Sequence, residues 1–247
     1  MATYDELGTT YRRTRVPDPR IQALVDRALG DARTVVNVGA GAGAYEPADR
    51  DVTAVEPSAV MIAQRPPDAA PCVQAGAEDL PFEDDSFDAA LSSLVIAFMR
   101  DADAGAREMA RVTKPGGVVA ECMWDIPGGG MTMLSTFWRA VKTVDPDSQG
   151  EQARVGVREG QIAQVLEGAG LEDVQSGTLD TSAHYDDFDD FWTPFTFAVG
   201  PAGAHLATLS AEQQDAIREE CRRQLGDPTG PFDLNARAWY ARGVVPA

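Results

Sequence analysis

The sequence predicts an α/β fold built on a doubly wound, mostly parallel sheet. Between residues 34 and 124, short apolar segments rich in β-branched residues alternate with loops and with segments of helical periodicity. This alternation is typical of a parallel sheet with helices on both faces. The first apolar segment, 35–38, runs directly into a loop with glycine at every second position, at Gly39, Gly41 and Gly43. Such a loop indicates that the backbone approaches a ligand closely at the carboxyl edge of the sheet.

Composition limits the class of protein. The chain has 247 residues, 44% of them hydrophobic, which suits one large domain or a domain with insertions. No run approaches the roughly twenty apolar residues of a membrane span, and the acidic N-terminus is unlike a secretory signal peptide. The three cysteines, Cys72, Cys122 and Cys221, are odd in number and widely spaced, which favours reduced thiols in the cytoplasm.

The net charge of −18 is the most unbalanced property of the sequence. An acidic surface repels the phosphates of nucleic acids and of anionic membranes, so neither is an expected partner. A small-molecule partner is expected instead. No group of histidines and carboxylates shows the spacing of metal ligands, so no metal is expected. The oligomeric state stays open.

The N-terminal segment, residues 1–33, precedes the first strand. Apolar residues from Ile21 to Leu29 recur at helical spacing, and Gly30 is a suitable end for that helix. Before it, aromatic and basic residues predict either a solvated helix or a flap over the ligand. In a flap, Tyr11 and Arg15 would be best placed to touch a carboxylate of the ligand.

A carboxylate follows the second predicted strand. Residues 51–55 form a short β-branched segment that ends at Glu56. An acid at this place beside a glycine-rich loop is the usual means of holding the two hydroxyls of a ribose. The glycine spacing is G-x-G-x-G rather than the dinucleotide fingerprint G-x-G-x-x-G, and at most one or two helical turns fit between Gly43 and Val52. These features favour a nucleoside ligand over a pyrophosphate.

The next elements continue the alternation. Ser58 is a candidate N-cap for a helix through residue 63, and prolines at 66, 67 and 71 predict a loop before a short strand near 72–74. An acidic loop then leads to an apolar strand and its exit over 89–98. After a helix over 106–112, the turn at 114–117 begins a strand over 118–124.

Together these motifs resemble the class I S-adenosylmethionine-dependent methyltransferases, in the small-molecule branch similar to quinone-biosynthesis and natural-product enzymes. The resemblance covers about residues 34–124. It rests on five motifs in the family's order: the glycine ladder at 39–43, Val-Glu-Pro-Ser at 55–58, Ala-Glu-Asp-Leu-Pro-Phe at 77–82, Ser-Phe-Asp at 86–88 and Arg-Val-Thr-Lys-Pro-Gly-Gly at 111–117. Residues 160–170, 174–180 and 236–245 resemble the family's later helix, sixth strand and antiparallel seventh strand. The resemblance implies a seven-stranded Rossmann-like sheet and S-adenosyl-L-methionine as cofactor.

The resemblance also implies roles for residues at matched positions. The glycine ladder would hold the methionine part of the cofactor, Glu56 the ribose, and the residues around 57 and 77 the adenine, while the end of the fourth strand would lie beneath the sulfonium. The implied cofactor-binding residues are Asn37, Gly39, Ala40, Gly41, Gly43, Glu56, Pro57, Ser58, Ala77, Glu78, Ser92 and Ser93, with Tyr11 and Arg15 of the flap.

Three positions depart from the family pattern. Asn37 stands where the family often has an acid, which weakens the attraction for the cofactor's ammonium group. Gly76 replaces a frequent aspartate, which leaves the adenine amino group to Glu78 or to the backbone. Ala97 and Phe98 stand where many relatives carry histidine, so no catalytic base is assigned there.

Two segments exceed what the sheet needs, and loops on a rigid scaffold are where specificity usually resides. The predicted organisation is an N-terminal helical flap (1–33), a cofactor-binding core (34–124), a lid insertion (125–159), a continuation of the core (160–181), a second lid insertion (182–233) and a final strand (234–247). Glycines at 128–130 suit a hinge. Most aromatic residues here are expected to pack the insertions, and a minority to line an apolar substrate pocket. The pocket candidates are Trp124, Trp138, Tyr185 and Trp192.

Methyl transfer from a sulfonium is an in-line displacement with a good leaving group, so positioning and exclusion of water can supply much of the catalysis. The expected acceptor is an O, C or N atom of an apolar small molecule. An aliphatic hydroxyl or a protonated amine would need a base. His184 is the candidate base, although its acidic neighbours favour an ion-paired, solvated role; His205 is the lesser candidate.

Two other functions stay open at this point. The same fold and cofactor can serve a cyclase-like or binding role without methyl transfer, for which the absent base and Asn37 leave room. The third function, an NAD(P)-dependent oxidoreductase, is opposed by the glycine spacing.

Overall fold

The computed structural model describes residues 11–14, 17–148, 150 and 155–247. They fall into two compact units. Unit 1 takes the described parts of 1–15, 124–153 and 180–237, and unit 2 takes those of 16–123, 154–179 and 238–247. Unit 1 thus gathers most of both predicted insertions, and unit 2 contains the predicted cofactor-binding residues apart from those of the N-terminal flap.

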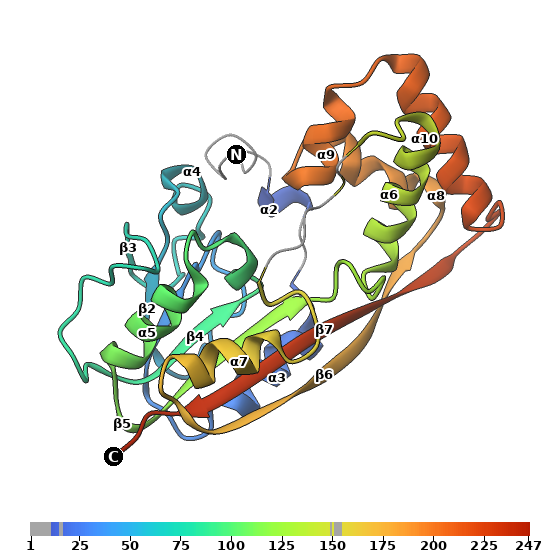
Figure 1. Ribbon diagram of the computed structural model, residues 1–247. Coiled ribbons are helices and arrows are strands. Elements are labelled where there is room, and N and C mark those ends of the chain that lie inside the picture. Colours follow the sequence, from blue (N-terminus) through green and yellow to red (C-terminus); the bar gives the residue numbers. More distant parts are fainter. Residues whose placement is uncertain (1–10, 15–16, 149, 151–154) are drawn as a thin grey trace. The chain divides into compact units, whose positions relative to one another are not determined.

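The strands form one seven-stranded sheet in the order β3-β2-β1-β4-β5-β7-β6 (Figure 1). Neighbouring strands from β3 to β5 are parallel. Backbone hydrogen bonds join Gly116 to Val245 and Asp125 to Arg237, so β7 runs antiparallel to β5. The strands are β1 (Thr34–Val38), β2 (Asp51–Val55), β3 (Cys72–Val73), β4 (Phe87–Ser93), β5 (Thr113–Trp124), β6 (Glu172–Tyr185) and β7 (Phe232–Val244). The predicted doubly wound, mostly parallel sheet is confirmed.

The strand order reverses between β1 and β4, because β2 lies on one side of β1 and β4 on the other. In an open α/β sheet, ligands bind beyond the carboxyl ends of the strands at such a switch point. β1 is buried on both faces, with Val35, Val36 and Val38 fully inaccessible to solvent. This burial explains the continuous apolar sequence of the strand.

Helices cover both faces of the sheet in unit 2. Figure 1 shows α5 and α7 in front of the strands and α3 behind them. The helical elements of this unit are α3 (Pro19–Leu29), α4 (Ala59–Ile62), η1 (Ile96–Phe98), α5 (Ala102–Val112) and α7 (Gln161–Gly168). The predicted signals act as expected: α3 ends at Gly30 with φ of 54°, and the Ser58 side chain accepts a hydrogen bond from the amide of Met61 to cap α4.

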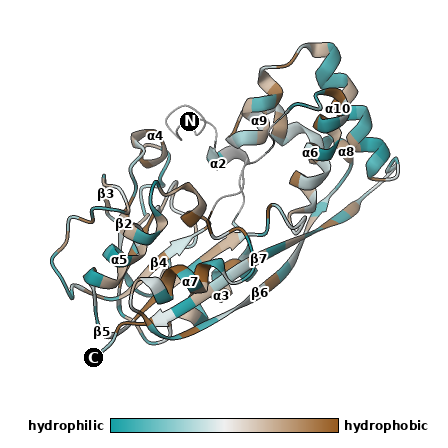
Figure 2. Cartoon of the chain, in the orientation of Figure 1, coloured by the Kyte–Doolittle hydropathy of each residue, from teal (hydrophilic) through white to brown (hydrophobic). Residues whose placement is uncertain are grey.

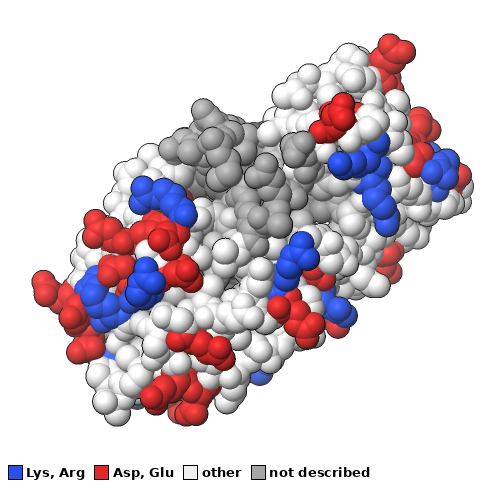
Figure 3. Space-filling view, in the orientation of Figure 1, with Lys and Arg blue, Asp and Glu red and all other residues white. Residues whose placement is uncertain are grey.

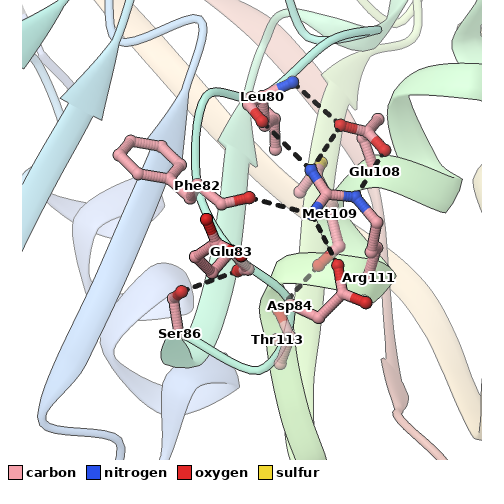
Figure 4. Close-up of polar contacts among 9 residues, drawn as sticks. All are labelled: Leu80, Phe82, Glu83, Asp84, Ser86, Glu108, Met109, Arg111 and Thr113. Atoms are coloured by element: carbon pink, nitrogen blue, oxygen red, sulfur yellow. Dashed lines mark hydrogen bonds and ion pairs between the residues drawn. The ribbon is translucent and has the colours of Figure 1, made fainter.

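Hydrogen bonds join two motifs of the family pattern, at 77–82 and 111–117, in unit 2. Arg111, near the end of α5, donates to the carbonyls of Leu80 and Phe82 and to the carboxylates of Asp84 and Glu108 (Figure 4). The hydrogen bond to Glu108, followed by that to Asp84, raises the pKa of the Arg111 guanidinium above its usual range. The shape of the loop after β3 therefore depends on a cation that lies about thirty residues further along the chain.

Asp88 ties the start of β4 to both neighbouring strands. Its carboxylate accepts hydrogen bonds from Lys114, at 2.7 Å, and from the backbone amides of Arg33 and Thr34. The ion pair with Lys114, then the backbone bonds, hold the pKa of Asp88 well below its usual range. β5 pairs with β4 at Thr113 and again from Val118, so the predicted turn at 114–117 is a bulge within the strand.

Unit 1 is built around aromatic side chains. Its helical elements are α2 (Tyr11–Thr14), α6 (Thr132–Val144), α8 (Phe188–Trp192), η2 (Thr193–Phe197), α9 (Gly200–Ala207) and α10 (Ala211–Gln224). Phe137 stacks on Phe195 with ring centroids 4.4 Å apart, and Phe191 is fully buried beside them. In Figure 2, α10 is mostly hydrophilic, and its buried residues are Ile217 and Cys221.

The glycines predicted as a hinge are required by a close approach in unit 1. Asp125 is buried and accepts a hydrogen bond from the amide of Gly128 at 3.0 Å. A Cβ on Gly128 would overlap the Asp125 carboxylate, a Cβ on Gly130 would press on it, and Gly129 has φ of 80°. These glycines therefore allow the chain to wrap tightly around one carboxylate; a hinge motion stays a prediction.

The structure refines the predicted bounds of several elements. The segment between Gly43 and Asp51 forms turns and no helix. β6 and β7 are longer than the predicted strands at 174–180 and 236–245, and both pass from one unit into the other. Among the described residues, no helix is long and apolar enough to cross a membrane. On the face that Figure 3 shows, acidic side chains are spread over the surface with basic ones among them.

Candidate cofactor site

The glycine loop follows the buried end of β1 at the switch point of the sheet. Gly39, Gly41 and Gly43 have φ of 73°, 53° and 92°, a region that side chains rarely adopt. The amides of Gly39 and Ala40 both donate to the carbonyl of Val55, at 2.8 and 3.0 Å, which fixes the loop to the end of β2. A Cβ on Gly39 would also overlap the Val95 side chain. The loop is thus a rigid turn that only glycine permits.

Glu56 lies at the carboxyl end of β2 and is 6% exposed. Its Oε2 accepts a hydrogen bond from the amide of Gly41 at 2.8 Å, and its Oε1 accepts one from the amide of Ser58 at 2.9 Å. The carboxylate is therefore oriented by the glycine loop on one side and by the start of α4 on the other. Pro57, between them, is exposed.

The predicted adenine contacts lie on the loop after β3. Ala77 is 9% exposed. The Glu78 carboxylate accepts hydrogen bonds from the amides of Arg100 and Asp101, at 2.7 and 3.2 Å. Burial raises the pKa of Glu78, but hydrogen bonds from backbone amides outweigh it and the net pKa is lowered. The side chain of Glu78 therefore fixes the loop before α5, and its contact with adenine stays a prediction.

Three polar residues lie at the ends of the central strands. Asn37, on β1, is 2% exposed, and Ser92, on β4, is fully buried. Ser93 is the last residue of β4. The Ser92 Oγ has no hydrogen-bond partner among the described residues. Buried hydroxyls are nearly always paired, so an unpaired one at a switch point indicates a place for a ligand.

The comparisons with known proteins agree with this geometry. The family model for a methyltransferase domain matches residues 36–120. The demethylmenaquinone methyltransferase of Mycolicibacterium gilvum is 32% identical over 165 residues, which are 62% of this chain and 69% of the relative. This chain belongs to the class I S-adenosylmethionine-dependent methyltransferases. It is an enzyme that uses S-adenosyl-L-methionine, and neither the cyclase-like role nor the oxidoreductase is favoured.

Solved structures share the fold of this methyltransferase. A putative type II methyltransferase from Anaeromyxobacter dehalogenans has a TM-score of 0.69 at 19% identity and covers 94% of this chain and 98% of its own. Phosphoethanolamine N-methyltransferase 2 of Haemonchus contortus, in complex with phosphomonomethylethanolamine and S-adenosylhomocysteine, has a TM-score of 0.60 at 17% identity. The match to the second covers all of this chain and 61% of the other.

The residues around the glycine loop of the methyltransferase fit its cofactor. A Cβ on Gly41 would lie 3.3 Å from the Met61 side chain, so the loop has little room for a larger residue at this position. Glu56 presents a carboxylate that the glycine loop orients, as the expected ribose contact requires, and Ser92 has a buried hydroxyl without a partner among the described residues. The cofactor supplies a methyl group on a sulfonium; that these residues hold it stays a prediction.

The structure also shows a support of the loop that the sequence did not reveal. Arg65 and Glu46 form an ion pair at 2.7 Å, with side chains only 6% and 10% exposed. Glu46 further accepts from the amide of Ala70, and Arg65 donates to the carbonyl of Gly41 at 3.4 Å. The sequence shows that the two residues have opposite charges. They are 19 positions apart, however, and no sequence pattern indicates that they are in contact.

The remaining candidates belong to unit 1. Tyr11 lies on α2, and Arg15 lies outside the described residues. Trp124 is the last residue of β5. Tyr185 and Trp192 are 8% and 7% exposed in the aromatic core, the packing role expected of most aromatic residues here. A contact of any of them with cofactor or substrate stays a prediction.

The two histidines differ in their surroundings. His184 is exposed, with its Nδ1 3.0 Å from Asp233 and its Nε2 3.6 Å from Asp186. These contacts match the ion-paired, solvated role that was the alternative to a catalytic role for His184. His205, on α9, packs its ring against Trp138 with centroids 5.3 Å apart. The His205 Nε2 and the Trp138 Nε1 are both buried and have no hydrogen-bond partner among the described residues.

Proposed function

We propose that the methyl acceptor is an apolar small molecule with an oxygen atom attached to an aromatic or quinol ring, and that Trp138 and His205 of unit 1 bind this oxygen. The observation that carries the proposal is the pair of unpartnered ring nitrogens on two rings in contact. Leaving a buried N–H without a partner costs about 1–3 kcal/mol, so a ligand that satisfies it gains affinity and specificity. An indole N–H donates only, and a neutral imidazole nitrogen either donates or accepts.

The surroundings of the pair favour an apolar ligand. Trp138 packs at the edge of the aromatic core of unit 1, with Met133 and Leu134 as other partly buried members of that edge. Apolar walls with a few polar groups are typical of small-molecule sites. A quinol hydroxyl suits the pair, because its oxygen accepts from the indole and the hydroxyl donates to or accepts from the imidazole; a phenolate oxygen can accept from both rings. The relative that acts on demethylmenaquinone supports a ring of this kind.

The reaction follows from the chemistry of the cofactor. The acceptor atom forms a bond to the methyl carbon as the bond from carbon to sulfur breaks, and the sulfonium becomes a neutral thioether. An activated ring oxygen or ring carbon needs little help beyond positioning. His205, in contact with the acceptor, would fix its orientation and take a proton from a hydroxyl where one is present.

A panel of acceptors tests the proposal. Purified protein is incubated with S-adenosyl-L-methionine and, in separate reactions, with a short-chain demethylmenaquinol, a catechol, a long-chain alcohol and an alkylamine, and S-adenosylhomocysteine is measured. Formation with the quinol or the catechol and none with the alcohol or amine is expected. Turnover of the amine or the alcohol alone would overturn the proposed class of acceptor.

A further inference from the structure

Glu121 is a buried acid that the functions above do not use. It lies on β5 and is 2% exposed. Neither oxygen of its carboxyl has a hydrogen-bond partner among the described residues. Burial raises the pKa of this carboxyl to about 8. Proteins rarely keep an unpaired acid in the interior, because its burial is unfavourable unless something compensates for it.

The position of Glu121 relates it to the cofactor site. In the parallel pairing of β4 and β5, Glu121 is the direct partner of Ser92, so both side chains emerge on the same face of the sheet. Ser92, like Ser93 after it, has a buried hydroxyl without a hydrogen-bond partner among the described residues. β1, which leads to the glycine loop, is the next strand beyond β4. Neighbouring strands lie about 4.8 Å apart, so the backbone of Glu121 on β5 lies about 10 Å from β1.

The charged groups of neighbouring elements do not neutralise Glu121. Burial is the sole cause of its altered pKa. On β4 and β5, Asp88 and Lys114 pair with each other, and on α5 Arg111 pairs with Glu108. The other charged residues of the adjoining elements are Arg20, Asp26 and Arg27 of α3, Asp103 and Arg107 of α5, Glu167 of α7, and Asp233, Arg237 and Arg242 of β7. Cys122, next on β5, has its pKa raised to about 11 by burial and, to a smaller extent, by Glu121.

We propose that Glu121 is the acid that responds to the positive charge of the methyl donor: it is neutral in the free protein and releases its proton when the sulfonium binds. The proposal rests on the cofactor of the family and is independent of the acceptor proposed above.

The expected size of the coupling is measurable. At an effective permittivity of about 20, a unit charge about 10 Å away changes the proton affinity of a carboxyl about tenfold. Because linkage is reciprocal, the ionised carboxyl strengthens the binding of the cation by the same factor. Affinity for S-adenosyl-L-methionine should therefore rise about tenfold from well below to well above pH 8. S-adenosylhomocysteine, whose sulfur is neutral, should show no such rise.

The test compares proton release by the two cofactor forms. Binding of S-adenosyl-L-methionine and of S-adenosylhomocysteine is measured calorimetrically at pH 7.5 in buffers of different ionisation enthalpy. Both molecules carry the same ammonium and carboxylate, so their difference isolates the sulfonium. We expect about half a proton more to be released by the sulfonium form. In Glu121→Gln this difference should vanish, and in Glu172→Gln, an exposed acid of β6, it should persist.

Equal proton release by the two forms in the wild-type protein would overturn the proposal, as would a difference that survives in Glu121→Gln. If Glu121→Gln does not fold, the wild-type protein still decides: the ratio of the two dissociation constants must change with pH near 8, and a constant ratio overturns the proposal. Failure of either form to bind would instead contradict the assignment of the cofactor site.

Discussion

Gly41 and Glu56 are joined by a hydrogen bond of 2.8 Å from the backbone nitrogen of Gly41 to Oε2 of Glu56. The bond connects the glycine loop after β1 to the acid after β2. We therefore expect one carboxylate to have two tasks in the complex: it would keep the loop in place and would contact the ribose. Preorganisation of this kind raises affinity because less order is lost on binding.

Glu56→Ala should weaken binding of S-adenosyl-L-methionine well over tenfold, because it removes both a charge-assisted ribose contact and the support of the loop. Calorimetric titration measures this directly. Glu83→Ala, which removes an exposed carboxylate from the loop after β3, is the matched control and should bind normally. Binding that is indifferent to Glu56→Ala would show that this site does not hold the cofactor.

Arg65→Met should destabilise the methyltransferase by about 3 kcal/mol, because it leaves the Glu46 carboxylate buried without its cation. Unfolding in urea measures the loss. The double variant Arg65→Met/Glu46→Gln should recover part of it, since no uncompensated charge remains. A loss below about 1 kcal/mol in the single variant, the range of surface pairs, would mean that the pair is solvated.

The stability of Glu121→Gln relative to the wild-type protein should depend on pH. In the unfolded chain the carboxyl ionises near its ordinary pKa of 4.5, and in the folded protein near 8. Between these values the folded state holds one proton more, so rising pH destabilises it by about 1.4 kcal/mol per pH unit. Glutamine does not ionise, and the variant should gain in relative stability from about pH 5 to pH 8.

Denaturation at pH 5, 6, 7 and 8 checks this expectation, with far-ultraviolet circular dichroism as the signal. Glu172→Gln serves again as the control and should follow the wild-type curve. A constant difference between Glu121→Gln and the wild-type protein over this range would mean that the Glu121 carboxyl ionises as it does in water.

Gly128→Ala should destabilise the protein by about 1–3 kcal/mol, because the new Cβ would overlap the Asp125 carboxylate. Gly168→Ala at the end of α7 is the contrasting variant, since a Cβ there meets nothing within 4 Å. It should be neutral or stabilise by up to about 1 kcal/mol. Thermal unfolding of both variants measures the contrast, and equal effects would contradict the close approach around Asp125.

His205→Gln should lower turnover of the acceptor at least tenfold, or raise its KM, while His184→Gln should stay within about twofold of the wild-type protein. His184 is exposed and paired with Asp233, whereas the His205 Nε2 is buried without a partner. Steady-state kinetics with an acceptor from the panel separate the two. The reverse order would return the role of base to His184 and contradict the proposed acceptor contact.

The sequence determined the sheet and the cofactor loop of this methyltransferase. Val35–Val38 and the glycines that follow form a strand, which β-branched residues favour, and a turn, which glycine favours, so local composition was sufficient. The position of Glu56 followed from the strand before it, and the Ser58 cap from its neighbours. Each of these features depends on residues that are close in the chain.

Only the tertiary structure decided the contacts between distant segments. The burial of Glu121 beside Ser92 depends on the register of two parallel strands, which a helix-containing crossover separates in the sequence. The hydrogen bonds from Arg111 to the loop at 80–84 also join segments that are distant in the chain. The contact between the rings of Trp138 and His205 does the same. A side chain's charge and hydrogen-bonding capacity are properties of the sequence, but whether they are satisfied depends on the neighbours that packing brings to it.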